Sequence, residues 1–139
     1  MKELEVNIEL DPVNDGASII NIKEVRIREE SALIMATNGK KRKAGFNEAA
    51  SIMETLKNTC HGEFMGKTPY IMIINGDKII KLDGGSFFIG SALIMKDEGD
   101  GRHMGSLSEL DIEKAETEFR SRLVTLTANG QEFSAYQLV

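Results

Sequence analysis

A repeated pentapeptide constrains the fold of this chain more than any other feature. Residues 31–35 and 91–95 share the sequence SALIM, sixty positions apart. A gapless alignment of residues 16–56 with 76–116 extends the match to twelve identities in 41 positions, whereas unrelated segments of ordinary composition share roughly two or three. A match at one fixed spacing is typical of a supersecondary unit that is used twice. We therefore expect an internally duplicated fold with a pseudo-two-fold axis.

The chain has strand patterns on both sides of each expected helix. Residues 4–10 alternate apolar and polar side chains, which is the period of a strand with one wet face. The Asn-Gly pairs at 38–39 and 129–130 favour tight hairpin turns. Residues 70–74 and 78–82 are expected to form a further hairpin around an Asn-Gly-Asp turn.

Two segments carry apolar residues at helical spacing. We expect Asn47 to cap the first helix and Gly62 to end it. Ser108 should cap the second helix, with Leu107 and Ile112 as a hydrophobic staple. The order strands, helix, strands, helix, strands predicts an α+β fold with mainly antiparallel sheet.

Length and composition favour one domain. The chain has 139 residues, 41% of them hydrophobic, which suffices for a core of its own. We expect a single domain over 1–139, with one repeat unit over about 1–62, a second over about 63–123 and a closing hairpin over 124–139. Its apolar runs are strand-sized, its start lacks a signal-peptide pattern and it has one cysteine, so we expect a cytoplasmic protein.

A cluster of positive charge is the first of two candidate binding segments. Lys40, Lys41, Arg42 and Lys43 form a basic run on an expected hairpin, in a chain whose net charge is −5. Such a run could hold phosphate groups, but the overall charge opposes long-range attraction to nucleic acid, and a solvated turn explains the run as well.

The equivalent loop of the second unit has the opposite charge. It contains Asp97, Glu98, Asp100 and Arg102. Contrasting loops on a duplicated unit predict contacts between neighbouring copies, hence a homo-oligomer. Divergence of the two loops after duplication, without a binding role, explains the contrast as well. The spacing does not fit a calcium-binding EF-hand loop, because the twelfth position counted from Asp97 is Ser108. We expect no metal site.

The remaining candidates concern a surface anchor and a nucleophile. Phe87 and Phe88 are consecutive in an expected strand, so one ring should be exposed and could anchor a partner or a subunit interface. Cys60 and His61 are adjacent, but neighbours in sequence rarely act together. No pattern predicts a cofactor, and catalysis by Cys60 with His61 or His103 lacks a supporting motif.

The second half of the chain resembles a family of small phage and mobile-element proteins. The similarity is carried by GSFFIG at 85–90, SLSE at 106–109 and DIEK at 111–114, about 30 of 139 residues. The resemblance implies an accessory gene of a phage or integrated element in a bacterium. Such genes often encode small acidic inhibitors of host defence, including anti-CRISPR proteins, that act by binding. It assigns no functional residue.

These observations lead to one function hypothesis and an alternative. The first is a non-enzymatic binding protein that inhibits a host component, such as a defence protein, by occlusion or sequestration. Its partner would be a host protein or a second copy of the chain. The alternative is a nucleic-acid-associated protein that contacts phosphate through residues 40–43.

Overall fold

The computed structural model describes residues 2–12, 18–29, 31–82, 84–99 and 104–138. It has the predicted α+β architecture, with mostly antiparallel sheets and two α-helices among the described residues. The predicted order of strands, helix, strands, helix, strands is confirmed. None of the helices in the described ranges is both long and apolar enough to cross a membrane.

The chain divides into two compact units, residues 1–30 and 31–139. The first contains strands β1 (Lys2–Pro12) and β2 (Ser18–Glu29), which pair antiparallel with each other. This division differs from the predicted repeat boundary near residue 62. Its physical reason is that β1 and β2 form a two-stranded sheet of their own and share no ladder with later strands.

The second unit is built on a six-stranded sheet with the order β4-β3-β9-β6-β5 and a short β10 paired to β9. Its strands are β3 (Ser31–Ala36), β4 (Lys41–Gly45), β5 (Cys60–Phe64), β6 (Tyr70–Asn75), β9 (Ser91–Asp97) and β10 (Met104–Gly105). The two SALIM segments are the adjacent central strands β3 and β9, which run antiparallel.

In the pairing of β3 with β9, repeat-equivalent residues do not lie opposite each other. Leu33 lies opposite Ile94, and Ile34 lies opposite Leu93. Since successive side chains of a strand point to opposite faces, equivalent residues of the two copies lie on opposite sides of the sheet. An axis perpendicular to the sheet would keep equivalents on one side, so the register does not confirm the predicted pseudo-two-fold axis.

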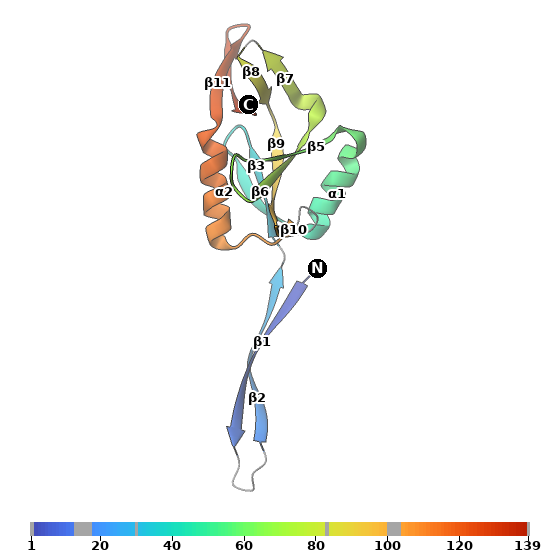
Figure 1. Ribbon diagram of the computed structural model, residues 1–139, viewed down its shortest axis with the longest axis vertical. Coiled ribbons are helices and arrows are strands. Elements are labelled where there is room, and N and C mark those ends of the chain that lie inside the picture. The colour runs from blue at the N-terminus through green and yellow to red at the C-terminus, as the bar shows by residue number, and fades with distance from the viewer. Residues whose placement is uncertain (1, 13–17, 30, 83, 100–103, 139) are drawn as a thin grey trace. The chain divides into compact units, whose positions relative to one another are not determined.

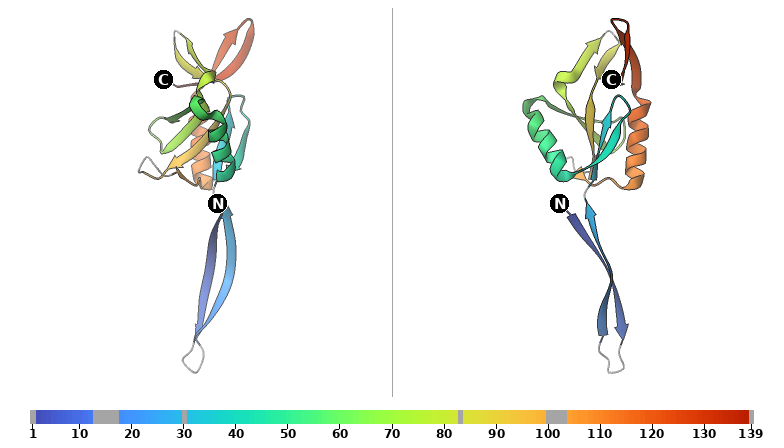
Figure 2. Two further views of the ribbon diagram at one scale, coloured as in Figure 1. Left: turned by 90° about the vertical axis from the view of Figure 1, so that its right-hand side faces the viewer. Right: turned by 180° about the vertical axis from the view of Figure 1, so that it is seen from behind.

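Each face of the sheet carries one helix. Helix α2 (Glu109–Ser121) packs with Leu33 and Ile94 in the larger core, which also contains Phe88 and Phe119. Helix α1 (Phe46–Leu56) packs with Leu93 and other residues of the opposite face in a smaller cluster. Figures 1 and 2 show the two helices on either side of the central strands. Residues 32–35 and 92–95 of these segments are all apolar, which fits strands with both faces covered.

A second sheet of four strands, with the order β11-β12-β8-β7, completes this unit. Its strands are β7 (Ile79–Leu82), β8 (Gly85–Phe88), β11 (Leu123–Ala128) and β12 (Gln131–Gln137). The predicted hairpin of residues 70–74 with 78–82 is wrong, because β6 and β7 belong to different sheets. A 3₁₀ turn, η2 (Gly76–Lys78), carries the chain from one sheet to the other.

The helix ends match the predictions in the second helix and differ in the first. Ser108 caps α2 through a capping box with Asp111, as its sequence position predicts. Gly45, not Asn47, caps α1, and no side chain bonds there. The first helix ends at Leu56, where Lys57 takes a positive φ of 49° and begins the 3₁₀ turn η1 (Lys57–Thr59). Gly62 therefore lies in strand β5 rather than at a helix end.

Gly90 joins the two sheets in a conformation that other residues avoid. Its φ is +145°, and a Cβ there would lie 3.2 Å from Phe88 Cζ and 3.3 Å from Lys78 Cδ. We expect Gly90→Ala to lower the free energy of unfolding by about 1–3 kcal/mol, measured by urea denaturation. Gly130→Ala, with φ +77° but open space around it, should cost only about 1 kcal/mol. Equal losses would show that the close contacts at Gly90 do not matter.

Candidate functional site

The predicted basic run lies at the turn after β3 and along the edge strand β4. Three of its four cations already form ion pairs with helix carboxylates. These pairs are Lys41–Glu116 at 2.6 Å, Arg42–Glu48 with hydrogen bonds of 3.0 and 2.5 Å, and Lys43–Glu109. The hydrogen bond from Lys41 lowers the pKa of Glu116, and that from Arg42 lowers the pKa of Glu48.

Alternation along β4 explains this arrangement. Lys41 and Lys43 reach α2 on one face of the sheet, whereas Arg42 reaches α1 on the other. Each exposed pair contributes little to stability by itself, because solvent screens the charges, but together the pairs connect the edge strand to both helices. A phosphate would have to compete with these carboxylates, so the geometry does not favour the nucleic-acid alternative.

The acidic candidates lie partly within the described residues. Asp97 ends β9, and its amide donates to the Pro69 carbonyl at 2.8 Å. Glu98 follows, with its carboxylate placed where a side chain at Gly105 would be. Asp100 and Arg102 lie outside the described residues. Contact of this loop with the basic run of another copy stays a prediction.

The expectation of an exposed phenylalanine is wrong. Phe87 and Phe88 are 6% and 1% exposed. Phe88 lies in the larger core, and β8 is an inner strand of its sheet, between β7 and β12. Neither ring is available as a surface anchor.

The Cys60-His61 pair lies on the edge strand β5. Adjacent residues of a strand point to opposite faces, so the thiol and the imidazole do not face each other. The imidazole Nε2 lies 3.3 Å from Glu63 Oε2, and Cys60 is exposed. No group of three potential metal-binding side chains occurs in the part of the chain that the structure describes. His103 lies outside that part.

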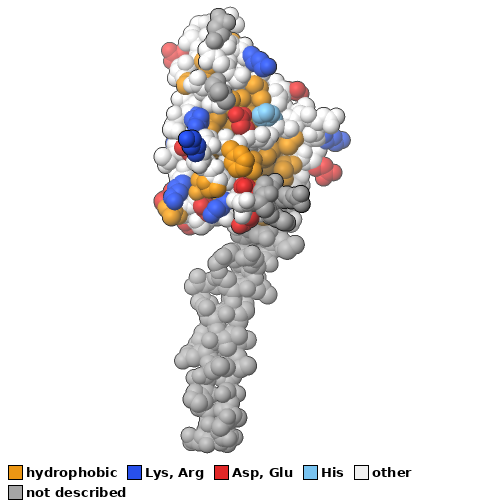
Figure 3. Space-filling model, in the orientation of Figure 1, with side chains coloured by type: hydrophobic (Ala, Val, Ile, Leu, Met, Phe, Trp, Pro, Cys, Tyr) orange, Lys and Arg blue, Asp and Glu red, His pale blue; other side chains and the backbone are white. Residues whose placement is uncertain are grey.

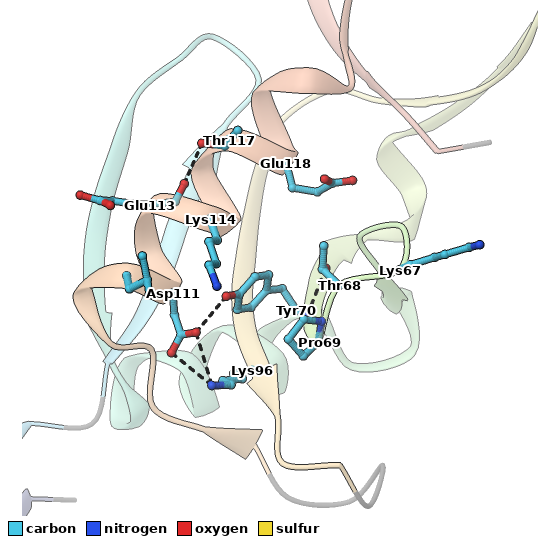
Figure 4. Close-up of a pocket in the computed structure, with 11 residues that line it drawn as sticks. Lys67, Thr68, Pro69, Tyr70, Lys96, Asp111, Glu113, Lys114, Thr117 and Glu118 are labelled. Carbon is cyan, nitrogen blue, oxygen red and sulfur yellow. Dashed lines mark hydrogen bonds and ion pairs between the residues drawn. The ribbon is translucent and has the colours of Figure 1, made fainter.

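A groove that the sequence did not indicate lies between α2 and the segment leading into β6. Its volume is about 690 Å³. Tyr70 begins β6 and is the cross-strand partner of Lys96 in β9, so the two side chains share a face beneath α2. Asp111, in the first turn of α2, points down onto both of them (Figure 4).

The Asp111 carboxylate is buried and accepts hydrogen bonds from three residues. The Tyr70 hydroxyl donates at 2.8 Å, and the amide and hydroxyl of Ser108 each donate at 2.9 Å. The Lys96 ammonium lies 3.3 Å from Oδ1. Burial alone would raise the pKa of Asp111, but these donors outweigh it and lower the pKa to about 2. Burial and the bond to Asp111 raise the pKa of Tyr70 to about 12.

Neither the Asp111 carboxylate nor the Tyr70 hydroxyl is set for proton transfer at neutral pH. A carboxylate with a pKa of about 2 stays ionised at neutral pH, and its oxygens already have donors. A tyrosine with a pKa of about 12 stays protonated and is not a nucleophile at neutral pH. The Lys114 side chain, one turn after Asp111, points toward the Tyr70 hydroxyl from the groove wall (Figure 4). The cluster therefore fixes α2 on the sheet.

The sequence contained one part of this cluster. The spacing Ser108-x-x-Asp111 is that of a capping box, with Asp in place of the usual Glu. Tyr70 and Lys96 lie 41 and 15 positions from Asp111. The register of β6 with β9 brings Tyr70 and Lys96 side by side, within reach of Asp111.

Comparison with models of known protein families, with curated proteins and with solved structures gives no match for this chain.

The Asp111 cluster predicts a specific acid sensitivity. An unfolded aspartate has a pKa of about 3.9, above the folded value of about 2. The stabilisation is therefore complete above pH 4 and is lost as the pH falls from 4 to 2. We expect this loss to be about 2–3 kcal/mol and to be absent in Asp111→Asn, measured by urea unfolding between pH 6 and pH 2. Glu113→Gln, an exposed neighbour on α2, should keep the wild-type pH dependence. A wild-type profile for Asp111→Asn contradicts the assignment.

Proposed function

We propose that this chain is a non-enzymatic binding protein whose β1–β2 ribbon holds a protein partner. The observation that carries the proposal is the pairing register of the ribbon. Four aliphatic residues of β1 lie opposite four aliphatic residues of β2. The pairs are Leu4–Ile27, Val6–Val25, Ile8–Ile22 and Leu10–Ile20.

A register shift in the ribbon keeps these residues together. Positions 20, 22, 25 and 27 do not follow a strict period of two, because 22 and 25 are three apart. The ladder shifts by one residue between Asn7 and Ile8, which leaves Lys23 without an opposite partner. Such a bulge restores the alternation on its far side. All eight aliphatic positions therefore share one face of the ribbon.

The opposite face has the composition of a solvated surface. In the register of the ribbon, Glu3 lies opposite Arg28 and Glu5 lies opposite Arg26, so both pairs join positions of opposite charge. A two-stranded hairpin is marginally stable in water unless its apolar face packs on something. In the described ranges, no third strand joins the sheet of the ribbon. A continuous aliphatic face opposite a charged one is thus suited to binding an apolar protein surface.

The class of partner follows from the resemblance to phage and mobile-element proteins. On that basis, the partner is a host component in the bacterial cytoplasm, such as a defence protein, that the chain inhibits by occlusion or sequestration. Phosphate binding through residues 40–43 stays an alternative prediction that the ion pairs do not favour.

We also propose that β3-β4-α1 and β9-β10-α2 are copies of one duplicated unit. Each begins with SALIM, continues into a strand that pairs back onto it and ends in a helix. The shared glycines at 45 and 105 lie at the end of the second strand in both copies.

The ribbon proposal is tested with two matched double variants. Val6→Thr with Val25→Thr alters one aliphatic cross-strand pair but keeps β-branched side chains, which favour strands. A hydroxyl buried without a partner costs about 1–3 kcal/mol. We therefore expect more than tenfold less partner to be recovered when the tagged chain is purified from its bacterium, measured by quantitative mass spectrometry.

The control changes the next pair on the other face. Glu5→Thr with Arg26→Thr should recover the same partner in wild-type amounts. Equal recovery by both double variants, or a loss confined to the control, contradicts binding through the aliphatic face.

A further inference from the structure

The two edges of the six-stranded sheet differ in their protection. At one edge, β4 carries Lys41, Arg42 and Lys43, and their ion pairs connect it to both helices. Charged side chains of this kind prevent another strand from pairing with an edge. At the other edge, β5 carries the sequence CHGEF, without lysine, arginine or proline. Only β4 has the usual protection against strand addition.

The outer side of β5 is open in the described part of the chain. Cys60, His61, Gly62 and Phe64 are exposed, and Glu63 is partly exposed. Among the described residues, β6 is the only strand joined to β5 by backbone hydrogen bonds. Figure 3 shows a histidine side chain at the surface next to an acidic one, and His61 Nε2 lies 3.3 Å from Glu63 Oε2.

We infer that β5 pairs with β5 of a second copy of this chain, antiparallel and centred on Gly62. In this register His61 lies opposite Glu63 of the second copy, and Glu63 lies opposite its His61. Within one chain these two side chains already share a face and lie 3.3 Å apart. The pairing therefore places two Glu63 carboxylates and two His61 imidazoles alternately on one face. In this register the strand is complementary to itself.

The opposite face of β5 fits the same register. Cys60, Gly62 and Phe64 share that face, and Phe64 is 49% exposed. The pairing would set Phe64 beside Cys60 of the second copy and diagonally over its Gly62. An aromatic ring across from a strand glycine covers backbone that the glycine leaves bare. Burial of this exposed phenylalanine adds an apolar contribution to the backbone hydrogen bonds.

Two charge variants test the register. In Glu63→Lys, the introduced lysine would face His61 of the second copy. In His61→Glu, the introduced glutamate would face Glu63. We expect each variant alone to self-associate at least tenfold more weakly than the wild type, measured by sedimentation equilibrium. An equimolar mixture should restore association, because each introduced charge then faces an opposite one.

Isotope labelling of one variant separates the mixed dimer from either homodimer in native mass spectra, near twice the chain mass of 15.4 kDa. Glu54→Lys, the same charge change at an exposed position of α1, should associate as the wild type does. A wild type that stays monomeric, variants that dimerise unchanged, or a mixture that stays monomeric overturns the inference. Unchanged circular dichroism and melting temperature of the variants would exclude misfolding as the cause of a loss.

Discussion

The antiparallel pairing of the two SALIM strands determines how the rest of the larger unit is arranged. Because Leu33 pairs with Ile94 rather than with Leu93, the two copies present equivalent residues to opposite faces. This is the relation produced by a half-turn about an axis in the plane of the sheet, combined with a shift of one strand. Each copy is followed by a helix, so the helices also lie on opposite faces. Both faces of the central strands are thereby covered, which suits a pentapeptide without a charged residue.

Ion pairs and hydrogen bonds of charged side chains connect the central sheet to the two helices. At one edge of the sheet, successive residues of 41–43 form ion pairs with α2, α1 and α2 in turn, so the edge strand β4 is connected to both helices. On the other side, the Asp111 carboxylate joins the first turn of α2 to Tyr70 and Lys96 on neighbouring strands. The basic run and the aspartate therefore have explanations within the fold. Neither has to be assigned to a ligand to account for its position.

Local signals in the sequence predicted local structure well. Ser108 caps a helix because its own side chain bonds the first turn, and Asn129-Gly130 turns a hairpin because both residues adopt positive φ. Features that depend on distant segments were missed. Residues 60–64 follow a helix but form a strand, since Lys57 ends the helical path and β6 supplies a ladder. Phe87 and Phe88 are both buried, although neighbouring residues of a strand point to opposite faces, because β8 is an inner strand of the second sheet and Phe88 enters the larger core. The Asp111 cluster depends on the register of β6 and β9, which no local pattern encodes.

The larger unit satisfies most of its polar and apolar groups by itself, and this makes its exceptions informative. No buried side-chain nitrogen or oxygen in the described residues lacks a hydrogen bond, and the edge strand β4 is held by ion pairs. Among the described residues, no further strand pairs with the outer edge of β5 or with the β1–β2 ribbon. The first offers backbone groups and a self-complementary His-Glu pattern, and the second offers eight aliphatic positions in register. A strand edge can be satisfied by an identical strand, whereas an apolar face requires another apolar surface. The two features therefore point to different contacts, one between copies of the chain and one with a partner protein.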